Sequence, residues 1–235
     1  MNVRKWQIFI VDDHPLVRLG ITQLVNAESD MFVCGEAEDM RTALRKLLTA
    51  AVDLVLLDLS LRGGDGFELL TQLRTQRPNQ RVLVVSTHDE RLYGERIIRA
   101  GASGYIMKAT EPDKILAAIR KALRGDLAVS EALAASLLSS VMLGQRREGQ
   151  SPLETLSDRE LEVFQLLAQG MVSRDIAKAL GISAKTVETH QFNVRTKLGA
   201  ESMHHLRRMA FAWTREGGED PRDIPAEPPP RAAAK

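Results

Sequence analysis

Five polar residues that could do chemistry together lie directly after short apolar runs of the sequence: Asp12, Asp13, Asp58, Ser86 and Lys108. Three carboxylates packed together repel one another unless a cation lies among them, and hard oxygen ligands of this kind suit Mg²⁺. Beside such an ion a carboxylate can attack phosphorus and form an aspartyl phosphate. A lysine can then bind one phosphoryl oxygen, and a hydroxyl can donate to another. These residue types therefore favour a phosphoryl-transfer pocket.

The segments around these residues predict a parallel sheet. Short apolar runs, read as strands, alternate with segments of helical periodicity; the strands are 8–11, 31–35, 53–57, 81–85 and 104–107, and the helices are 15–27, 39–51, 66–76, 91–100 and 112–124. Continuous apolar strands indicate a sheet covered on both faces. Right-handed crossovers then give a doubly wound (βα)5 α/β domain of the flavodoxin-like class over residues 1–125. Because the carboxyl ends of the strands converge, the five polar residues would share one crevice.

Each of these residues also has an ordinary explanation. Turns favour aspartate, so a single Asp at a strand end indicates little. Ser86 alone could be a loop hydroxyl, and Lys108 alone could be a solvated surface lysine. Only their joint placement at one edge of the sheet favours the pocket.

A second, all-α unit is predicted over residues 153–216. Ser157 followed by Glu160 predicts a capping box at the start of its first helix. Ser173 is expected to cap a second helix that ends at a glycine, and Ser183 to cap a third. A short helix, a glycine-containing turn and a helix with a polar outer face are typical of the helix-turn-helix, in which the last helix enters the major groove.

The third helix, residues 184–198, carries the candidate DNA contacts. We expect five side chains to face base edges: Lys185, Glu188, Thr189, Phe192 and Asn193. The remaining candidates are better suited to phosphates or lie at the start of the helix: Ser183, Thr186, Arg195 and Lys197. From Arg174 to Arg215 the chain has eight basic and three acidic residues, a surplus of five that suits a polyanion. Without this surplus, a bundle that binds protein would be an equal alternative.

Residues 126–152 are expected to form a helical linker and a flexible tether. Ser130 predicts the start of a helix through Met142, whose apolar stripe needs a partner surface: Leu133, Leu137, Leu138 and Val141. The segment 144–152 has no apolar periodicity. Residues 217–235 are rich in proline and poor in large aliphatic residues, which predicts a disordered tail.

The composition indicates a cytoplasmic globular protein with no membrane partner. Cys34 is the only cysteine of the 235 residues, so no intramolecular disulfide can form, as is usual in a reducing compartment. No apolar run approaches the length that spans a bilayer. The net charge of +1 hides the local basic surplus of the second unit.

Four segments resemble the receiver domain of two-component response regulators: VDDHPLVRLG, DLVLLDLSLRGGDGFELL, VLVVSTHD and AGASGYIMKA. The resemblance implies that Asp58 accepts phosphate from a sensor histidine kinase, with Lys108 and Ser86 beside it, and that Ser86 and Tyr105 form a switch. Tyr105 could equally be a rim aromatic without that role. The resemblance also implies a magnesium site made by the carboxylates of Asp12, Asp13 and Asp58 and the backbone carbonyl of Ser60.

The same resemblance places Ser60 and His88 where the family tunes phosphate lifetime. At two positions in neighbouring loops, the sequence departs from the usual receiver pattern. Arg62 and Ala109 stand where many receivers have proline, which leaves the loop conformations open but removes no chemical group.

The segments LSDRELEVFQLLAQG and SRDIAKALGISAKTVETHQFNVRTKLGA resemble the LuxR-type DNA-binding domain, and together with a receiver they make the chain similar to the NarL/FixJ family. This implies a transcription regulator that binds double-stranded promoter DNA, forms a homodimer when phosphorylated and catalyses only its own aspartyl phosphorylation and dephosphorylation. The alternatives are a Mg²⁺-dependent phosphatase or phosphotransferase and a protein-binding adaptor. A stripe near the C-terminus could make the dimer contact or close the domain core: Met203, Leu206, Met209, Ala210 and Trp213.

Overall fold

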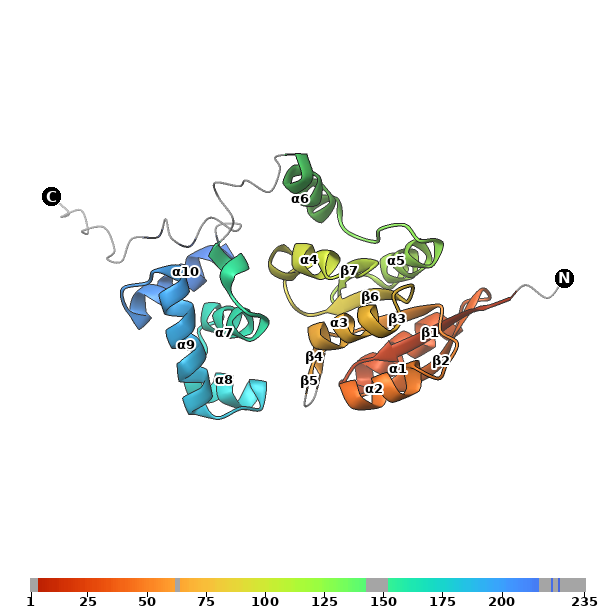
Figure 1. The fold of residues 1–235 in the computed structure, drawn as a ribbon, viewed down its shortest axis with the longest axis horizontal. Helices are drawn as coiled ribbons and strands as arrows, with labels where there is room; N and C mark the ends of the chain where they lie inside the picture. The colour runs from red at the N-terminus through yellow and green to blue at the C-terminus, as the bar shows by residue number, and fades with distance from the viewer. Residues whose placement is uncertain (1–3, 62–63, 143–151, 216–220, 222–223, 225–235) are drawn as a thin grey trace. The chain divides into compact units, whose positions relative to one another are not determined.

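The structure is a computed structural model that describes residues 4–61, 64–142, 152–215, 221 and 224. The chain forms two compact units, Met1–Gln145 and Arg146–Lys235. Figure 1 shows the helices and strands of both units with their labels.

A five-stranded parallel sheet forms the centre of the first unit. Its strands run in the order β2-β1-β3-β6-β7. The elements are β1 (Trp6–Val11), α1 (Pro15–Asn26), β2 (Met31–Ala37), α2 (Met40–Leu47), β3 (Leu54–Leu57), β4 (Ser60–Leu61), β5 (Gly64–Asp65), α3 (Gly66–Gln76), β6 (Arg81–Ser86), α4 (Glu90–Arg99), β7 (Gly104–Met107) and α5 (Pro112–Arg124). All five expected strand–helix pairs are present, which confirms the doubly wound α/β fold. The antiparallel pair β4–β5 was not expected, because two-residue strands leave no periodic signal.

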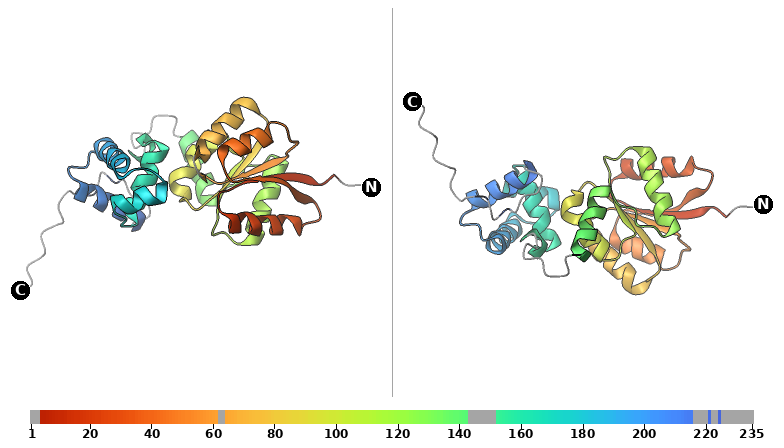
Figure 2. Two further views of the ribbon diagram at one scale, coloured as in Figure 1. Left: turned by 90° about the horizontal axis from the view of Figure 1, so that it is seen from below. Right: turned by 90° about the horizontal axis from the view of Figure 1, so that it is seen from above.

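Helices cover both faces of this sheet. Figure 2 shows α1 and α5 on one face and α2 and α3 on the other. Between the sheet and the α1–α5 layer, Ile8 and Leu56 of the strands and Val25 and Ile119 of the helices are at most 1% exposed. Burial on both faces explains why the strands read as continuous apolar runs.

Gly66, the first residue of α3, packs against the backbone beside Asp58. Its amide donates to the Leu59 carbonyl at 2.9 Å. A Cβ at this position would lie 2.3 Å from the Asp58 carbonyl oxygen and 2.6 Å from the Leu59 Cα. Only glycine therefore allows α3 to start this close to the end of β3.

Helix α6 (Glu131–Met142) packs against α4 within the first unit. As expected, the Ser130 hydroxyl caps it, accepting from the Leu133 amide at 3.1 Å. Leu133 is buried against Gly94 of α4, and the Ser140 hydroxyl donates to Glu95 at 2.6 Å. Leu138 of the expected stripe is 64% exposed and so does not pack within the described residues. The tether expected over 144–152 lies outside the described residues except for Pro152.

The described part of the second unit contains helices and no strands. Its elements are η1 (Pro152–Thr155), α7 (Asp158–Ala168), α8 (Ser173–Leu180), α9 (Ala184–Leu198) and α10 (Met203–Arg215). The capping box of Ser157 and Glu160 is confirmed, as is the Ser183 cap of α9. The expected Ser173 cap is wrong: Val172 is the N-cap residue of α8, and the Ser173 hydroxyl instead donates to the buried Gln191 amide oxygen at 3.2 Å.

The apolar stripe of α10 lies in the core of this unit. Leu206, Met209, Ala210 and Trp213 are at most 6% exposed, and the Trp213 ring meets Phe164 of α7 edge to face. This favours the interpretation that the stripe closes the core over the interpretation that it makes a dimer contact.

Of the expected tail, 217–235, the structure describes only Pro221 and Ile224, and the Ile224 carbonyl lies 2.7 Å from His205 Nε2 of α10. The rest of the tail lies outside the described residues. Among the helices that the structure describes, none combines the length and the apolar character needed to cross a bilayer.

Gly66→Ala should destabilise the first unit by about 1–3 kcal/mol, because the added methyl group meets backbone atoms that cannot move aside. Gly20→Ala is the matched control: this site on α1 has open space around it, so alanine should stabilise the helix by about 0.5–1 kcal/mol. Urea unfolding followed by Trp6 fluorescence in a Trp213→Phe background reports on the first unit alone. Equal stability of the two variants would contradict the close approach of Gly66.

Candidate functional site

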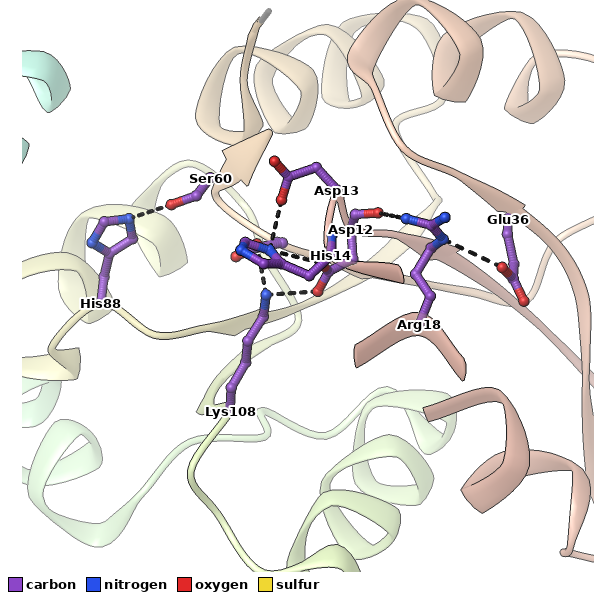
Figure 3. A network of polar contacts seen from close by, with 9 residues as sticks. Asp12, Asp13, His14, Arg18, Glu36, Ser60, His88 and Lys108 are labelled. Carbon is purple, nitrogen blue, oxygen red and sulfur yellow. Dashed lines mark hydrogen bonds and ion pairs between the residues drawn. The ribbon is translucent and has the colours of Figure 1, made fainter. Parts of the chain in front are cut away.

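The carboxyl ends of β1, β3 and β7 bring three of the predicted residues, Asp12, Asp58 and Lys108, into direct contact. Figure 3 shows Asp12 and Lys108 at this edge of the sheet. Asp12 and Asp58 are each 2% exposed. Lys108 Nζ lies 2.6 Å from Asp12 Oδ2 and 2.7 Å from Asp58 Oδ2, so one ammonium group bridges both carboxylates. The Lys108 amide also donates to the Ser86 carbonyl at 2.8 Å, which fixes the start of the loop after β7.

Burial controls the electrostatics of this pocket. Burial raises the pKa of Asp58, and neighbouring Asp12 raises it further, while Lys108 lowers it without cancelling the effect. Burial also lowers the pKa of Lys108, but the two carboxylates outweigh this and raise it overall. Lys108 alone therefore does not fully stabilise the charged form of Asp58.

The donor set fits a small divalent cation. Ligand atoms of Asp12, Asp13, His14 and Asp58 all lie within 4.8 Å of one another. Asp58 Oδ1 is buried and has no hydrogen-bond partner among the described residues. An unpaired, buried carboxylate oxygen is costly, and a hard cation is the partner that its chemistry favours. The carboxylates of the expected magnesium site thus form a cluster that could bind a metal ion.

The two expected switch residues are both buried and both contact the same backbone segment. The Ser86 hydroxyl accepts from the His88 amide at 3.2 Å, and the Tyr105 hydroxyl donates to the His88 carbonyl at 2.8 Å. Burial raises the pKa of Tyr105 far above its usual range, although its contact with Ser86 opposes this. Because Tyr105 is 2% exposed, the interpretation as a rim aromatic is disfavoured.

Ser60 and His88 meet at the edge of the pocket, where Ser60 Oγ lies 2.8 Å from His88 Nε2 (Figure 3). The structure therefore brings together the two positions that the resemblance to receivers singled out. Of the two departures from the receiver pattern, Arg62 lies outside the described residues. Ala109 lies in a short turn after β7, which the Thr110 amide closes by donating to the Met107 carbonyl at 3.0 Å.

Sequence reasoning missed two residues of the site, His14 and Arg18. His14 Nδ1 lies 2.7 Å from Asp13 Oδ1 and 3.3 Å from Asp12 Oδ1. Arg18 Nη1 donates to the Asp12 carbonyl at 2.6 Å and so holds the backbone beneath the acidic pair. Their position directly after the acidic pair, one helical turn apart, was the available signal.

The outer face of α9 carries most of the candidate DNA contacts. Lys185, Glu188, Thr189 and Phe192 are exposed, and Asn193 is half-buried. The buried side of the helix is formed by Val187, Gln191, Val194 and Leu198. The Arg195 guanidinium lies 5.2 Å from the centroid of the Phe192 ring, which restrains both side chains by a cation–π contact. At the N-terminus, Ser183 Oγ accepts from the Thr186 amide at 3.1 Å.

Lys197, expected to contact phosphate, is engaged inside its own unit. Its Nζ donates to Glu160 Oε2 at 2.6 Å and to the Thr155 carbonyl at 3.1 Å. Burial raises the pKa of Glu160, but Lys197 and Ser157 outweigh it, so the pKa is lowered overall. The nearby His190 is half-buried, and burial together with Arg159 lowers its pKa.

Comparison with known proteins classifies both units. Residues 8–120 match the model of the response regulator receiver domain, and residues 154–210 match that of the bacterial regulatory proteins of the luxR family. The fold and these matches define a DNA-binding regulator with a receiver domain. The chain belongs to the two-component response regulators of the NarL/FixJ type.

Relatives of known name support this assignment. The Fimbriae Z protein of Salmonella typhimurium is 36% identical over 85% of this chain and 93% of its own. The oxygen regulatory protein NreC of Staphylococcus aureus is 33% identical over 85% of this chain and 94% of its own.

Two solved structures are similar as well. RcsB from Salmonella enterica serovar Typhimurium, bound to promoter rprA in the presence of the phosphomimetic BeF3⁻, is 25% identical, with a TM-score of 0.59 over 87% of this chain and 98% of that one. A LuxR-family response regulator from Aurantimonas sp. SI85-9A1 is 31% identical, with a TM-score of 0.55 over 59% of this chain and 99% of that one.

The raised pKa of Asp58 predicts how the metal-free first unit responds to pH. The pKa of Asp58 is higher in the folded state than in the unfolded state, where it is about 3.9. Protonated Asp58 therefore favours folding at low pH, and this contribution is lost as the pH rises through the folded-state pKa. Asp58→Asn removes the effect, so the variant should gain stability relative to the wild type as the pH rises from about 4 to 8. Urea unfolding with a chelator, followed by Trp6 fluorescence in the Trp213→Phe background, measures the difference. A difference that stays constant or falls with pH would contradict the electrostatic account.

Lys197→Met should destabilise the second unit by roughly 1 kcal/mol, because the buried Glu160 carboxylate loses its cation while water still screens part of the pair. Lys185→Met is the control, since Lys185 is exposed on the same helix. Urea unfolding followed by Trp213 fluorescence in a Trp6→Phe background isolates this unit. Unchanged stability together with weaker DNA binding would instead support the phosphate-contact expectation for Lys197.

Proposed function

We propose that Asp58 is the phosphoryl acceptor of this response regulator and that phosphate on Asp58 changes the affinity of α9 for promoter DNA. The observation that carries the proposal is the environment of Asp58. One of its oxygens is paired with Lys108 at 2.7 Å, and the other is buried and unpaired among the described residues. A carboxylate held in this way is oriented as a nucleophile and has a cation beside it for the incoming charge.

A sensor histidine kinase is the proposed phosphoryl donor. An oxygen of Asp58 attacks the phosphorus of the phosphohistidine, the new O–P bond forms as the N–P bond breaks, and the imidazole nitrogen leaves. Lys108 then pairs with a phosphoryl oxygen, and the Ser86 hydroxyl donates to another. Loss of the phosphoryl group to water returns the carboxylate, and this self-dephosphorylation is the other reaction that we propose.

A Mg²⁺ ion is the proposed cofactor. The carboxylates of Asp12, Asp13 and Asp58 and the Ser60 backbone carbonyl would hold this ion, which would supply positive charge beside the phosphoryl group. The clustered carboxylates and the unpaired Asp58 oxygen support this choice.

The signal leaves the pocket through the loop before α4. Ser86 and Tyr105 both bond to the His88 backbone, and the next residue, Asp89, is the N-cap of α4, where it accepts from the Arg91 amide at 2.9 Å. Drawing the Ser86 hydroxyl toward a phosphoryl group removes its bond to His88 and so shifts the start of α4. Helix α6 packs on α4 and precedes the second unit in the chain. The result that we propose is altered dimerisation or release of the DNA-binding unit.

The proposed target is double-stranded promoter DNA. We assign base contacts to Lys185, Glu188, Thr189, Phe192 and Asn193 and backbone contacts to Ser183, Thr186 and Arg195. RcsB bound to promoter DNA with BeF3⁻ supports this assignment by its similarity to the chain. A homodimer of the phosphorylated form would read two half-sites. In this role the protein works in the cytoplasm, with residues 1–125 as receiver and 153–216 as DNA-binding domain.

The direct test compares the wild type with Asp58→Asn, each with and without Mg²⁺ and beryllofluoride, an acyl-phosphate mimic. Sedimentation and binding to promoter DNA should change in the wild type alone. Asp53→Asn is the matched control, because Asp53 precedes β3 at the opposite end of the sheet and pairs with Arg4 at 2.8 Å. A response of equal size in Asp58→Asn would overturn the proposal.

Glu188→Ala and Lys185→Ala should weaken DNA binding by about 1–3 kcal/mol at one base pair of the binding site and relax the preference there. Lys121→Ala on α5 is the control, since this exposed lysine belongs to the first unit. Competition binding with a set of singly mutated duplexes measures the preference. A uniform loss over all duplexes would assign these side chains to phosphates instead.

A further inference from the structure

We propose that His14 contributes an imidazole nitrogen to the divalent-cation site, so that the site favours a transition-metal ion such as Mn²⁺ over Mg²⁺ more strongly than its oxygen ligands alone would. This inference rests on the proposed phospho-acceptor pocket and deepens it. It concerns which ion the pocket selects, and none of the receiver and LuxR-type motifs assigns a role to His14.

The spacing of His14 from the carboxylates matches that of ligands on one ion. In octahedral coordination with ligand distances of about 2.1 Å, adjacent ligand atoms lie about 3.0 Å apart and opposite ones about 4.2 Å. His14 Nδ1 lies 2.7 Å from Asp13 Oδ1, 3.3 Å from Asp12 Oδ1 and 3.9 Å from Asp58 Oδ2. All of these distances fall near or between the two values, so His14 already has the spacing of a ligand.

The backbone holds His14 in this place. Its amide donates to Asp12 Oδ1 at 2.7 Å, and it is the N-cap residue of α1, followed by Pro15. Its carbonyl accepts from the Arg18 amide at 3.1 Å, which fixes the first turn of the helix. Since the backbone is fixed on both sides, only the side-chain torsions remain free, and little ordering is needed on metal binding.

The ring enters the pocket on the side that Lys108 leaves open. Figure 3 shows Lys108 reaching the carboxylates from one side, Asp13 on the other side and the His14 ring among them. The His14 side chain is 59% exposed, whereas that of Lys108 is 9% exposed. A cation arriving from solvent therefore meets the imidazole at the mouth of the site before it reaches Asp58.

An imidazole ligand changes the selectivity of the site. Mg²⁺ strongly prefers oxygen ligands and keeps several waters, whereas first-row transition metals accept imidazole more readily, Mn²⁺ the least readily among them. Adding one nitrogen to three carboxylates thus raises the affinity for Mn²⁺ more than that for Mg²⁺. The alternative is that His14 pairs with Asp13 as an imidazolium ion and never binds metal.

The test measures metal binding directly on the full-length protein. Titration with Mn²⁺, followed by the electron paramagnetic resonance of the free ion, gives the Mn²⁺ affinity, and competition with Mg²⁺ gives the ratio of the two. Electron spin-echo modulation of bound Mn²⁺ detects a directly coordinated imidazole ¹⁴N. The wild type should show this nitrogen, whereas His14→Ala and His14→Gln should lack it and lose roughly tenfold in the Mn²⁺-to-Mg²⁺ affinity ratio. His204→Ala, at an exposed histidine of the second unit, is the control and should match the wild type.

The outcomes separate this inference from the proposed function. Bound Mn²⁺ without nitrogen modulation in the wild type, or an unchanged affinity ratio in His14→Ala, overturns the role of His14 and leaves the phospho-acceptor pocket standing. If neither ion binds the wild type and beryllofluoride has no effect, the proposed function itself fails. Circular dichroism of both His14 variants confirms that each is folded.

Discussion

Burial of two carboxylates beside one lysine is the constraint on which the site of the first unit depends. The parallel sheet brings Asp12 and Asp58 to one edge, where both are almost completely buried. Burial raises the pKa of Asp58, and Lys108 offsets only part of this although it lies within 2.7 Å of both residues. The fold therefore keeps an excess of negative charge at one point. Such a point responds strongly to a cation or to a phosphoryl group, because in a medium of low dielectric constant each added charge has a large effect.

The contacts around the pocket connect this electrostatic centre to the rest of the unit. Ser86 and Tyr105 bond to the amide and the carbonyl of one residue, His88, directly before α4. Helix α4 in turn packs on α6, with Leu133 filling the space that Gly94 leaves. These elements form a contiguous set of packed groups between Asp58 and α6.

In the second unit, contacts from other helices hold α9 in place. Glu160 takes part in the capping box of α7 and also binds Lys197 near the end of α9, so one buried carboxylate fixes two helices. On the outer face of α9, Arg195 restrains the exposed Phe192 ring. Because the helix is held from its buried side, its exposed side chains keep a defined spacing for a polyanionic partner.

The sequence alone determined the five strand–helix pairs, the helical second unit and the shared edge of Asp12, Asp58 and Lys108. These follow from local signals, namely continuous apolar strands and helix caps, together with the rule that parallel strands end at one edge. Only the tertiary structure decided that Lys197 binds Glu160, that His14 enters the carboxylate cluster and that Ser173 does not cap α8. Those outcomes depend on which side chains from separate elements meet, and on the buried charges and hydrogen-bonding groups that must find a partner. No local pattern of the sequence contains that information.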